Sequence, residues 1–245
     1  MAGLEYLSPE DLRLDGRKAP ELRKLNARLG VFQQSDGSAY LEQGSTMVLA
    51  TVNGPHESMN RSRASNDTAF VNCQFSMATF STSERRRRTK GDRRSTEMSQ
   101  FIQDTFEAAI LTHLYPRCQI DIYVQIMQAG GGHLAACINA ASLAVMDAGI
   151  PTKDLVCACT TTLVKETAIV DVTYLEESAG PLVTMAMLAR SGSIILTQME
   201  KRLHVDQLSA LVESGTKGCK DVSVLLSVFL RTHITDQLAV QGVPQ

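Results

Sequence analysis

Three consecutive glycines open a run of small residues in Gly130-Gly131-Gly132-His133-Leu134-Ala135-Ala136-Cys137-Ile138-Asn139-Ala140-Ala141. Apolar and polar residues alternate from 120 to 126 before the glycines, and apolar residues recur at helical spacing from 134 to 148 after them. This pattern predicts a strand, a glycine loop and a helix. The loop would leave backbone N–H groups free at the positive end of the helix dipole, an arrangement suited to binding phosphate. His133 and Leu134 begin the helix, so the arginine or lysine that would complete an anion site is missing.

Composition places the chain among globular proteins. Its 245 residues are 44% hydrophobic and 20% charged, which suffices for one large core or two modest halves. Because the formal net charge is −2, any contact with nucleic acid must come from a local basic patch. The six cysteines lie mostly in apolar runs, which favours reduced core thiols over a disulfide framework. Apolar runs fall short of the roughly 20 residues that cross a bilayer, so no membrane contact is expected.

The order of the patterns predicts an arm followed by two α+β halves. Residues 1–26 are polar and turn-rich, with a tight turn at Asp15-Gly16. Residues 27–150 form the first half, a strand meander followed by the helix whose apolar residues run from Phe101 to Leu114, then the strand and helix around the glycines. Gly149-Ile150-Pro151 marks the boundary. Residues 151–245 form the second half, strands first and then two helices ending near Leu238.

A strongly basic segment precedes the first long helix. It holds Arg85, Arg86, Arg87 and Arg88, and after a short gap Arg93 and Arg94. A charge run of this kind is most often a solvated loop, and its functional alternative is contact with a polyanion such as RNA. Arg93 and Arg94 differ from the upstream run because they stand at the mouth of the helix. A fixed guanidinium pair there would hold phosphates bidentately.

Two acids stand close together in the second half. Asp171 and Glu177 are six residues apart, a spacing that puts both on one side if the segment is extended. Paired carboxylates can hold Mg²⁺ or act as a general acid. The alternative is that they merely solvate a turn at a strand end. The histidines form no Ser/His/Asp grouping, and Cys157-Ala158-Cys159 lacks a second pair at zinc spacing, so neither a nucleophilic hydrolase nor a zinc site is supported.

Several short motifs keep the order found in one protein family. They are Arg13-Leu14-Asp15-Gly16-Arg17, Gly54-Pro55-His56-Glu57, Arg93-Arg94-Ser95, Gln119-Ile120-Asp121-Ile122-Tyr123-Val124-Gln125, Asn139-Ala140-Ala141 and Asp147-Ala148-Gly149-Ile150-Pro151. On these motifs the chain resembles the RNase PH family and, within it, the ring subunits of the RNA exosome. The resemblance implies the α+β RNase PH fold (ribosomal protein S5 domain 2-like), with two βαβα-type halves, in a six-subunit ring that threads RNA.

The resemblance also assigns roles to residues. Active members degrade RNA from its 3′ end by phosphorolysis with inorganic phosphate and Mg²⁺. By resemblance Arg93 and Arg94 grip the RNA backbone, Asp171 matches the catalytic aspartate, and Glu177 stands where a second aspartate is usual. The active phosphate motif reads Gly-Gly-Thr/Ser-Arg, whereas this chain has Gly131-Gly132-His133-Leu134. Phosphate binding by Gly131, Gly132 and His133 is therefore expected to be weakened, and both acids are expected to be vestigial.

Three hypotheses follow from the resemblance. The first is a non-catalytic exosome ring subunit that binds single-stranded RNA through Arg85 to Arg88, Arg93 and Arg94 and passes it to a separate processive nuclease. Its partners would be other RNase PH-like ring subunits and RNA-binding cap subunits, with roles in rRNA processing and mRNA turnover in nucleus, nucleolus and cytoplasm. It needs no cofactor. The second is an active phosphorolytic 3′–5′ exoribonuclease using Mg²⁺ and phosphate. The third is a structural spacer that never touches RNA.

Overall fold

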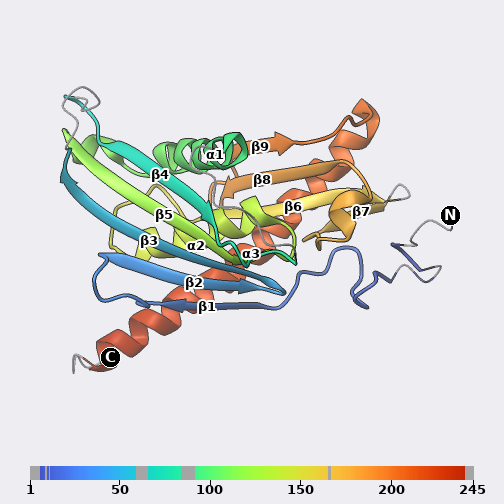
Figure 1. Cartoon of the computed structure of the whole chain (residues 1–245), viewed down its shortest axis with the longest axis horizontal. Helices are drawn as coiled ribbons and strands as arrows, with labels where there is room; N and C mark the ends of the chain where they lie inside the picture. The colour runs from blue at the N-terminus through green and yellow to red at the C-terminus, as the bar shows by residue number, and fades with distance from the viewer. Residues whose placement is uncertain are drawn as a thin grey trace.

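The computed structural model describes residues 6–8, 10, 12–58, 66–83, 92–164 and 167–240. The first of its two sheets has the strand order β1-β2-β3-β5-β4 (Figure 1). Its strands are β1 (Leu25–Leu29), β2 (Gly37–Gln43), β3 (Thr46–Glu57), β4 (Phe70–Met77) and β5 (Cys118–Gln128). All neighbours pair antiparallel except β4 and β5, which are parallel. Parallel pairing needs a crossover, and helix α1 (Arg93–Ala109) supplies it.

The second sheet is antiparallel, in the order β7-β6-β8-β9. Its strands are β6 (Val156–Val164), β7 (Thr167–Val170), β8 (Leu182–Leu188) and β9 (Ile194–Met199). Two short 3₁₀ helices, η1 (Thr112–Leu114) and η2 (Glu176–Ser178), lie in connections, and helix α3 (Val205–Val240) ends the described chain. Strands precede helices in this half as the sequence predicts, and the α+β class is confirmed.

Helix α2 (His133–Asp147) joins the two sheets into one core. It contacts β2 and β3 of the first sheet and β6 of the second, and its residues are buried from Leu134 to Val145. Asn139 exchanges two hydrogen bonds with the Ala158 backbone on β6: its amide nitrogen donates to the carbonyl at 2.9 Å, and its amide oxygen accepts from the N–H at 2.7 Å. The small residues that the sequence shows along this helix therefore permit close packing on both sides.

The predicted pair of C-terminal helices is wrong, since residues 205–240 form one continuous helix. Gly215 and Gly218 do not break it. A Cβ atom at Gly218 would lie 2.5 Å from Val170 Cγ1, and one at Gly215 would lie 2.8 Å from Met185 Sδ. The glycines thus let α3 approach the second sheet closely. No helix in the described parts of the chain is long and apolar enough to cross a membrane.

Candidate nucleic-acid interface

The glycine loop between β5 and α2 has the geometry that the sequence predicts. Gly131 has φ +109° and Gly132, the N-cap of α2, has φ +61°, a left-handed conformation that favours glycine. A Cβ atom at Gly131 would lie 2.5 Å from the backbone of Thr173 and Tyr174. The loop therefore lies in backbone contact with the turn that follows β7, and only glycine permits that approach.

The carbonyl groups of this loop are held by the protein itself. Arg23 donates from Nη1 to the Gly130 carbonyl at 3.3 Å and from Nη2 to the Gly131 carbonyl at 3.2 Å. Thr46 Oγ1 donates to the Gly131 carbonyl at 2.7 Å. Because these oxygens are paired with buried groups, the orientation of the loop is fixed. Such pre-orientation is what an anion-binding loop requires.

An acidic side chain already occupies the amide end of the loop. The Gly132 N–H donates to Glu177 Oε1 at 2.8 Å. Burial raises the pKa of Glu177 above its usual value, although the Gly132 N–H and the charges of Arg94, Arg23 and Lys201 act in the opposite direction. The N-terminus of α2 is thus capped by a carboxylate of the same chain.

Asp171 takes part in a buried ion pair. Its carboxylate accepts from the Arg23 backbone N–H at 2.7 Å, from Arg23 Nε at 3.0 Å and Nη2 at 2.7 Å, and from Gln43 Nε2 at 2.8 Å. The backbone at Asp171 is left-handed, with φ +56°, and the chain then turns into η2. The segment between Asp171 and Glu177 is therefore not extended, because a left-handed residue, a turn and the start of η2 lie within it.

A second buried pair anchors the N-terminal arm. Arg13 donates from Nε to Glu176 Oε1 at 2.8 Å and from Nη2 to Oε2 at 2.5 Å, and its Nη1 reaches the Val170 carbonyl at 2.7 Å. Burial would raise the pKa of Glu176, but the hydrogen bonds from Arg13 and Thr173 together with the Arg13 charge lower it overall. The predicted tight turn at Asp15-Gly16 is present, with the Gly16 N–H donating to the Arg13 carbonyl at 3.0 Å.

The two arginines at the start of α1 differ in their surroundings. Helix α1 begins at Arg93 after the N-cap Asp92. The Arg93 side chain is 92% exposed and pairs with Glu97 at 2.9 Å. Arg94, in contrast, acts electrostatically on Glu177 and so belongs to the surroundings of the glycine loop. Both arginines are exposed, and the charge of Arg94 acts to lower the pKa of Glu177, while Arg85, Arg86, Arg87 and Arg88 lie outside the described residues.

The helix residues after the loop face different environments. His133 is half-buried, whereas Leu134 is 4% exposed and packs in the main hydrophobic core. Leu134 therefore contributes apolar packing at the position where the resemblance expects an arginine.

The buried thiols behave as core residues too: burial raises the pKa of Cys73 to about 12 and that of Cys219 to about 12.

The arrangement does not fit a Mg²⁺ site at Asp171 and Glu177. The Asp171 carboxylate is saturated by Arg23 and Gln43, and one Glu177 oxygen is committed to the Gly132 N–H. Mg²⁺ would need oxygen ligands in near-octahedral geometry. Among the described residues no group of three or more His, Cys, Asp or Glu side chains is placed to hold a metal ion.

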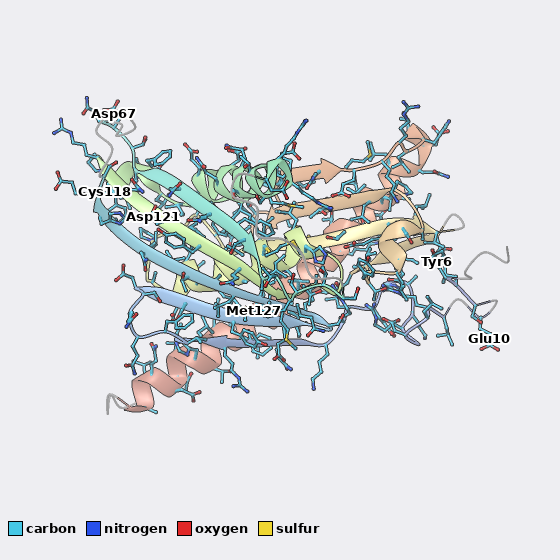
Figure 2. All side chains as sticks on the ribbon, in the orientation of Figure 1. Tyr6, Glu10, Asp67, Cys118, Asp121 and Met127 are labelled. Atoms are coloured by element: carbon cyan, nitrogen blue, oxygen red, sulfur yellow. The ribbon has the colours of Figure 1, made fainter. Side chains whose placement is uncertain are left out.

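A separate polar cluster surrounds Asp121. His56 Nε2 lies 3.3 Å from Asp121 Oδ2, and Asn72 and Gln119 donate to Oδ1 at 2.8 and 2.7 Å. Figure 2 shows Asp121 and Cys118 at one end of the molecule and Tyr6 at the opposite end. The Tyr6 hydroxyl lies 3.2 Å from the Ser178 hydroxyl, next in sequence to Glu176 and Glu177. The Asp121 cluster is therefore remote from that part of the molecule.

Sequence reasoning missed Arg13, Arg23 and Glu176. Their partners lie 148 to 163 residues away in the chain. The only available signal was the presence of arginines in an arm that is otherwise polar and turn-rich. The sequence carries no periodic pattern that connects this arm to residues 170–177.

Comparisons with known proteins agree with this geometry. Residues 21–151 match the 3′ exoribonuclease family, domain 1, and residues 154–218 match domain 2 of the same family. The chain is 56% identical to exosome complex component RRP41 of Mus musculus over 238 residues, covering 96% of this chain and 97% of the relative. It is 54% identical to the Homo sapiens protein of that name over 244 residues, covering 99% and 100%.

Solved structures share the fold. Rice (Oryza sativa) Rrp46 superposes with a TM-score of 0.79 at 21% identity, over 89% of this chain and 100% of that chain. A chain of the Archaeoglobus fulgidus exosome, solved with RNA bound to the active site, gives a TM-score of 0.77 at 18% identity, over 87% and 92%. Two sheets around a shared helix, with a glycine loop at its N-terminus, define an RNase PH-type domain. The chain belongs to the RNase PH family, the 3′ exoribonuclease family.

Proposed function

We propose that this chain is a ring subunit of an RNA exosome that binds RNA and does not itself carry out phosphorolysis. The names of its relatives, exosome complex component RRP41 in mouse and human, support the assembly part of the proposal. The coverage of both chains is nearly complete, so the likeness extends over the whole domain and not over one motif. At the level of subunit type we propose the position called exosome component 4.

The proposal that the chain is non-catalytic rests on the N-terminus of α2. There the amide of Gly132 is paired with the carboxylate of Glu177, and the side chain of Leu134, two residues further on, is buried. A phosphate ion approaching the Gly132 N–H would find it already bound by the Glu177 carboxylate, and no arginine at position 134 to bind the phosphate instead. Loss of one electrostatic interaction with a reacting group commonly costs about 3 kcal/mol of transition-state stabilisation, or roughly a hundredfold in rate. Repulsion between two unit charges about 4 Å apart adds about 4 kcal/mol at an effective dielectric constant of about 20.

The RNA-binding part rests on local charge. Arg94 and Lys201 both act on the surroundings of Glu177, and Lys201 Nζ donates to the Glu177 carbonyl at 3.1 Å. The arginine-rich segment at 85–88 adds charge by its place in the sequence. Since the net charge of the chain is −2, this concentration of cations marks a local path for a polyanion.

A reconstituted ring tests both parts. It is incubated with 3′-labelled RNA, inorganic phosphate and Mg²⁺, and the products are separated. The expected result is no phosphate-dependent release of nucleoside diphosphates by the ring without its associated nuclease. Release that disappears in Glu177→Ala would instead establish the alternative, an active phosphorolytic exoribonuclease.

RNA binding is tested with a matched pair on one helix. Arg94→Glu is expected to weaken RNA affinity and to reduce the slope of log affinity against log salt by about 0.7 for each single-strand phosphate that the protein no longer neutralises. Arg93→Glu, whose side chain is exposed and paired with Glu97, is the control for a nonspecific change of charge. If both variants bind as the wild type does, the chain is a spacer that does not contact RNA.

The wider assignment follows from exosome membership. We propose other RNase PH-like ring subunits, RNA-binding cap subunits and a separate processive nuclease as partners. On the same basis we propose roles in rRNA processing and mRNA turnover in nucleus, nucleolus and cytoplasm. Co-purification of the tagged chain, followed by mass spectrometry of nuclear and cytoplasmic fractions, checks these assignments.

A further inference from the structure

We propose that His233 is a proton-controlled latch for the last turns of α3. When its Nε2 carries a proton, the imidazole ties these turns to Asp147 at the end of α2, and when Nε2 is unprotonated the tie is released. Asp147 ends the helix that Gly132 begins, so the latch lies away from the glycine loop. It does not depend on the proposed RNA-binding role.

Helix α3 is anchored unevenly along its length. Its N-terminal part packs through buried apolar side chains, among them Leu211, Cys219, Val222 and Leu226. Beyond Leu226 no described side chain of the helix is buried, and from 231 to 239 every residue except His233 is exposed. Figure 1 shows this end of α3 extending past β1 to the C-terminus. The last turns are therefore attached to the rest of the domain mainly through His233.

The attachment point is a carboxylate that also binds the first sheet. His233 Nε2 lies 3.1 Å from Asp147 Oδ1, and the two side chains are 22% and 9% exposed. The other carboxylate oxygen, Asp147 Oδ2, accepts from the N–H groups of Ser38 at 2.9 Å and Gly30 at 3.3 Å. Because Asp147 is held by both ends of the connection between β1 and β2, His233 links the end of α3 to α2 and to the first sheet together.

A second partner competes for the same ring nitrogen. Gln237, one turn further along α3, has its Nε2 2.8 Å from His233 Nε2. A ring nitrogen that carries a proton can only donate, and one without a proton can only accept. Protonated Nε2 therefore donates to Asp147, whereas unprotonated Nε2 accepts from the Gln237 amide and turns its lone pair toward the Asp147 carboxylate. The two contacts exclude each other, so the proton on Nε2 decides which of them is made.

The charge of the imidazolium adds to this choice. Imidazole side chains commonly change charge between about pH 5 and about pH 8, and a charge-assisted hydrogen bond is roughly twice as strong as a neutral one. The charged group that α2 brings to His233 is Asp147. The other charged or titratable groups of the packed elements lie elsewhere: Arg28 beside Tyr40 on β1, Asp36 bonded to the Gly54 N–H, His133 at the opposite end of α2, and the exposed Arg231 and Asp236 on α3. Acidification therefore strengthens the latch, and a rise in pH weakens it.

Hydrogen exchange of the full chain tests the latch, because a released helix end exchanges its amides faster. The protection of residues 227–240, expressed relative to intrinsic exchange at each pH, is expected to fall severalfold between about pH 5.5 and about pH 8. His233→Gln cannot titrate in this range, so its protection is expected to be independent of pH. Gln237→Ala removes the competing donor and is expected to retain protection at the higher pH. Asp236→Asn removes an exposed carboxylate one turn away; it is the matched control and is expected to behave as the wild type.

Nitrogen NMR of the histidine-labelled chain gives a readout that a purely structural contact would not move. The His233 signals are assigned by their loss in His233→Gln. Nε2 is expected to be protonated at acid pH, and the tautomer with the proton on Nδ1 is expected to appear as pH rises. An Nε2–H form that persists to about pH 8 would overturn the latch. So would protection of 227–240 that does not change with pH in the wild type, or that changes equally in His233→Gln.

Discussion

The buried pair of Arg23 and Asp171 makes a quantitative prediction about stability. The Asp171 carboxylate accepts four hydrogen bonds of 2.7 to 3.0 Å from Arg23 and Gln43, and the side chains of the ion pair are 5% and 2% exposed. Asp171→Ala leaves the guanidinium buried without its counter-charge, which typically costs about 3–5 kcal/mol. Typical domains have only about 5–15 kcal/mol of stability in total. The melting temperature of a chain of this size is therefore expected to fall by roughly 6–20 °C.

Urea denaturation followed by circular dichroism measures this cost. Asp171→Asn separates charge from backbone strain, because asparagine tolerates the left-handed φ of +56° better than alanine does. Arg23→Met combined with Asp171→Leu is expected to lose less stability than the sum of the single variants, since neither charge is then left unpaired. A wild-type denaturation midpoint in Asp171→Ala would refute the reasoning and would return Asp171 to the role of an available catalytic carboxylate.

Three further predictions concern the glycine loop. The folded-state pKa of Glu177 is raised, so its carboxyl group contributes stability that is present below the unfolded pKa and is lost as pH rises through the folded pKa. In parallel urea titrations, the stability of Glu177→Gln relative to wild type is therefore expected to improve between pH 4 and pH 8. A difference that does not depend on pH would contradict this. Leu134→Arg, alone or with Glu177→Asp, is expected to raise the phosphate-dependent release of nucleoside diphosphates. It is also expected to lower the free energy of unfolding by about 1–3 kcal/mol, because the side chain at position 134 is only 4% exposed. If the release of nucleoside diphosphates does not respond to phosphate, the defect lies elsewhere in the site. Gly131→Ala is expected to lower the free energy of unfolding by more than about 4 kcal/mol, since its Cβ would lie 2.5 Å from backbone atoms. Gly149 also has a positive φ, +69°, but no atom lies within 4 Å of the place that a Cβ would take, so Gly149→Ala is expected to cost about 1–2 kcal/mol by thermal denaturation. Equal effects of the two substitutions would show that the turn moves aside.

The sequence predicted the parts of the fold that repeat locally. Alternation in residues 120–126 and helical spacing after Leu134 correspond to β5 and α2, because each pattern reflects burial on one face of a regular element. The sequence predicted two helices where the structure has the single helix α3, whose Gly215 and Gly218 lie close to the second sheet. The condition on which Asp171 and Glu177 were expected to share a side, an extended segment, is not met because the chain turns between them; both nevertheless reach the glycine loop, Glu177 through the Gly132 N–H and Asp171 through Arg23.

The site could be predicted only where its chemistry is contained in one short segment. The loop glycines and the lack of an arginine or lysine directly after them are visible in the sequence, whereas Arg23, which donates to the loop carbonyls, is not. Arg23 is 148 residues from Asp171, and a pairing of that kind depends on how the sheets meet. A cavity lined by Asp15, Ser45, Ser83, Gly130 and Tyr174 likewise draws on five separate segments. Non-local ion pairs and pockets are set by tertiary packing, which local patterns do not encode.

The two buried ion pairs and Glu177, whose carboxylate caps α2, differ in which substitutions the fold can tolerate. Arg23–Asp171 and Arg13–Glu176 fix the ends of the turn that directly precedes Glu177, and both are buried; Arg13 binds both oxygens of Glu176, whereas Arg23 Nε and Nη2 both donate to Asp171 Oδ1. Replacing one partner of either pair leaves a charge in the core, so these positions are constrained by folding. Glu177 and Leu134 are not bound by such a pair, and substitution there changes the anion site without removing a buried counter-charge. The scaffold can therefore persist while the groups at the anion site change, which is the division of roles that the proposed function requires of a ring subunit passing its substrate to another nuclease.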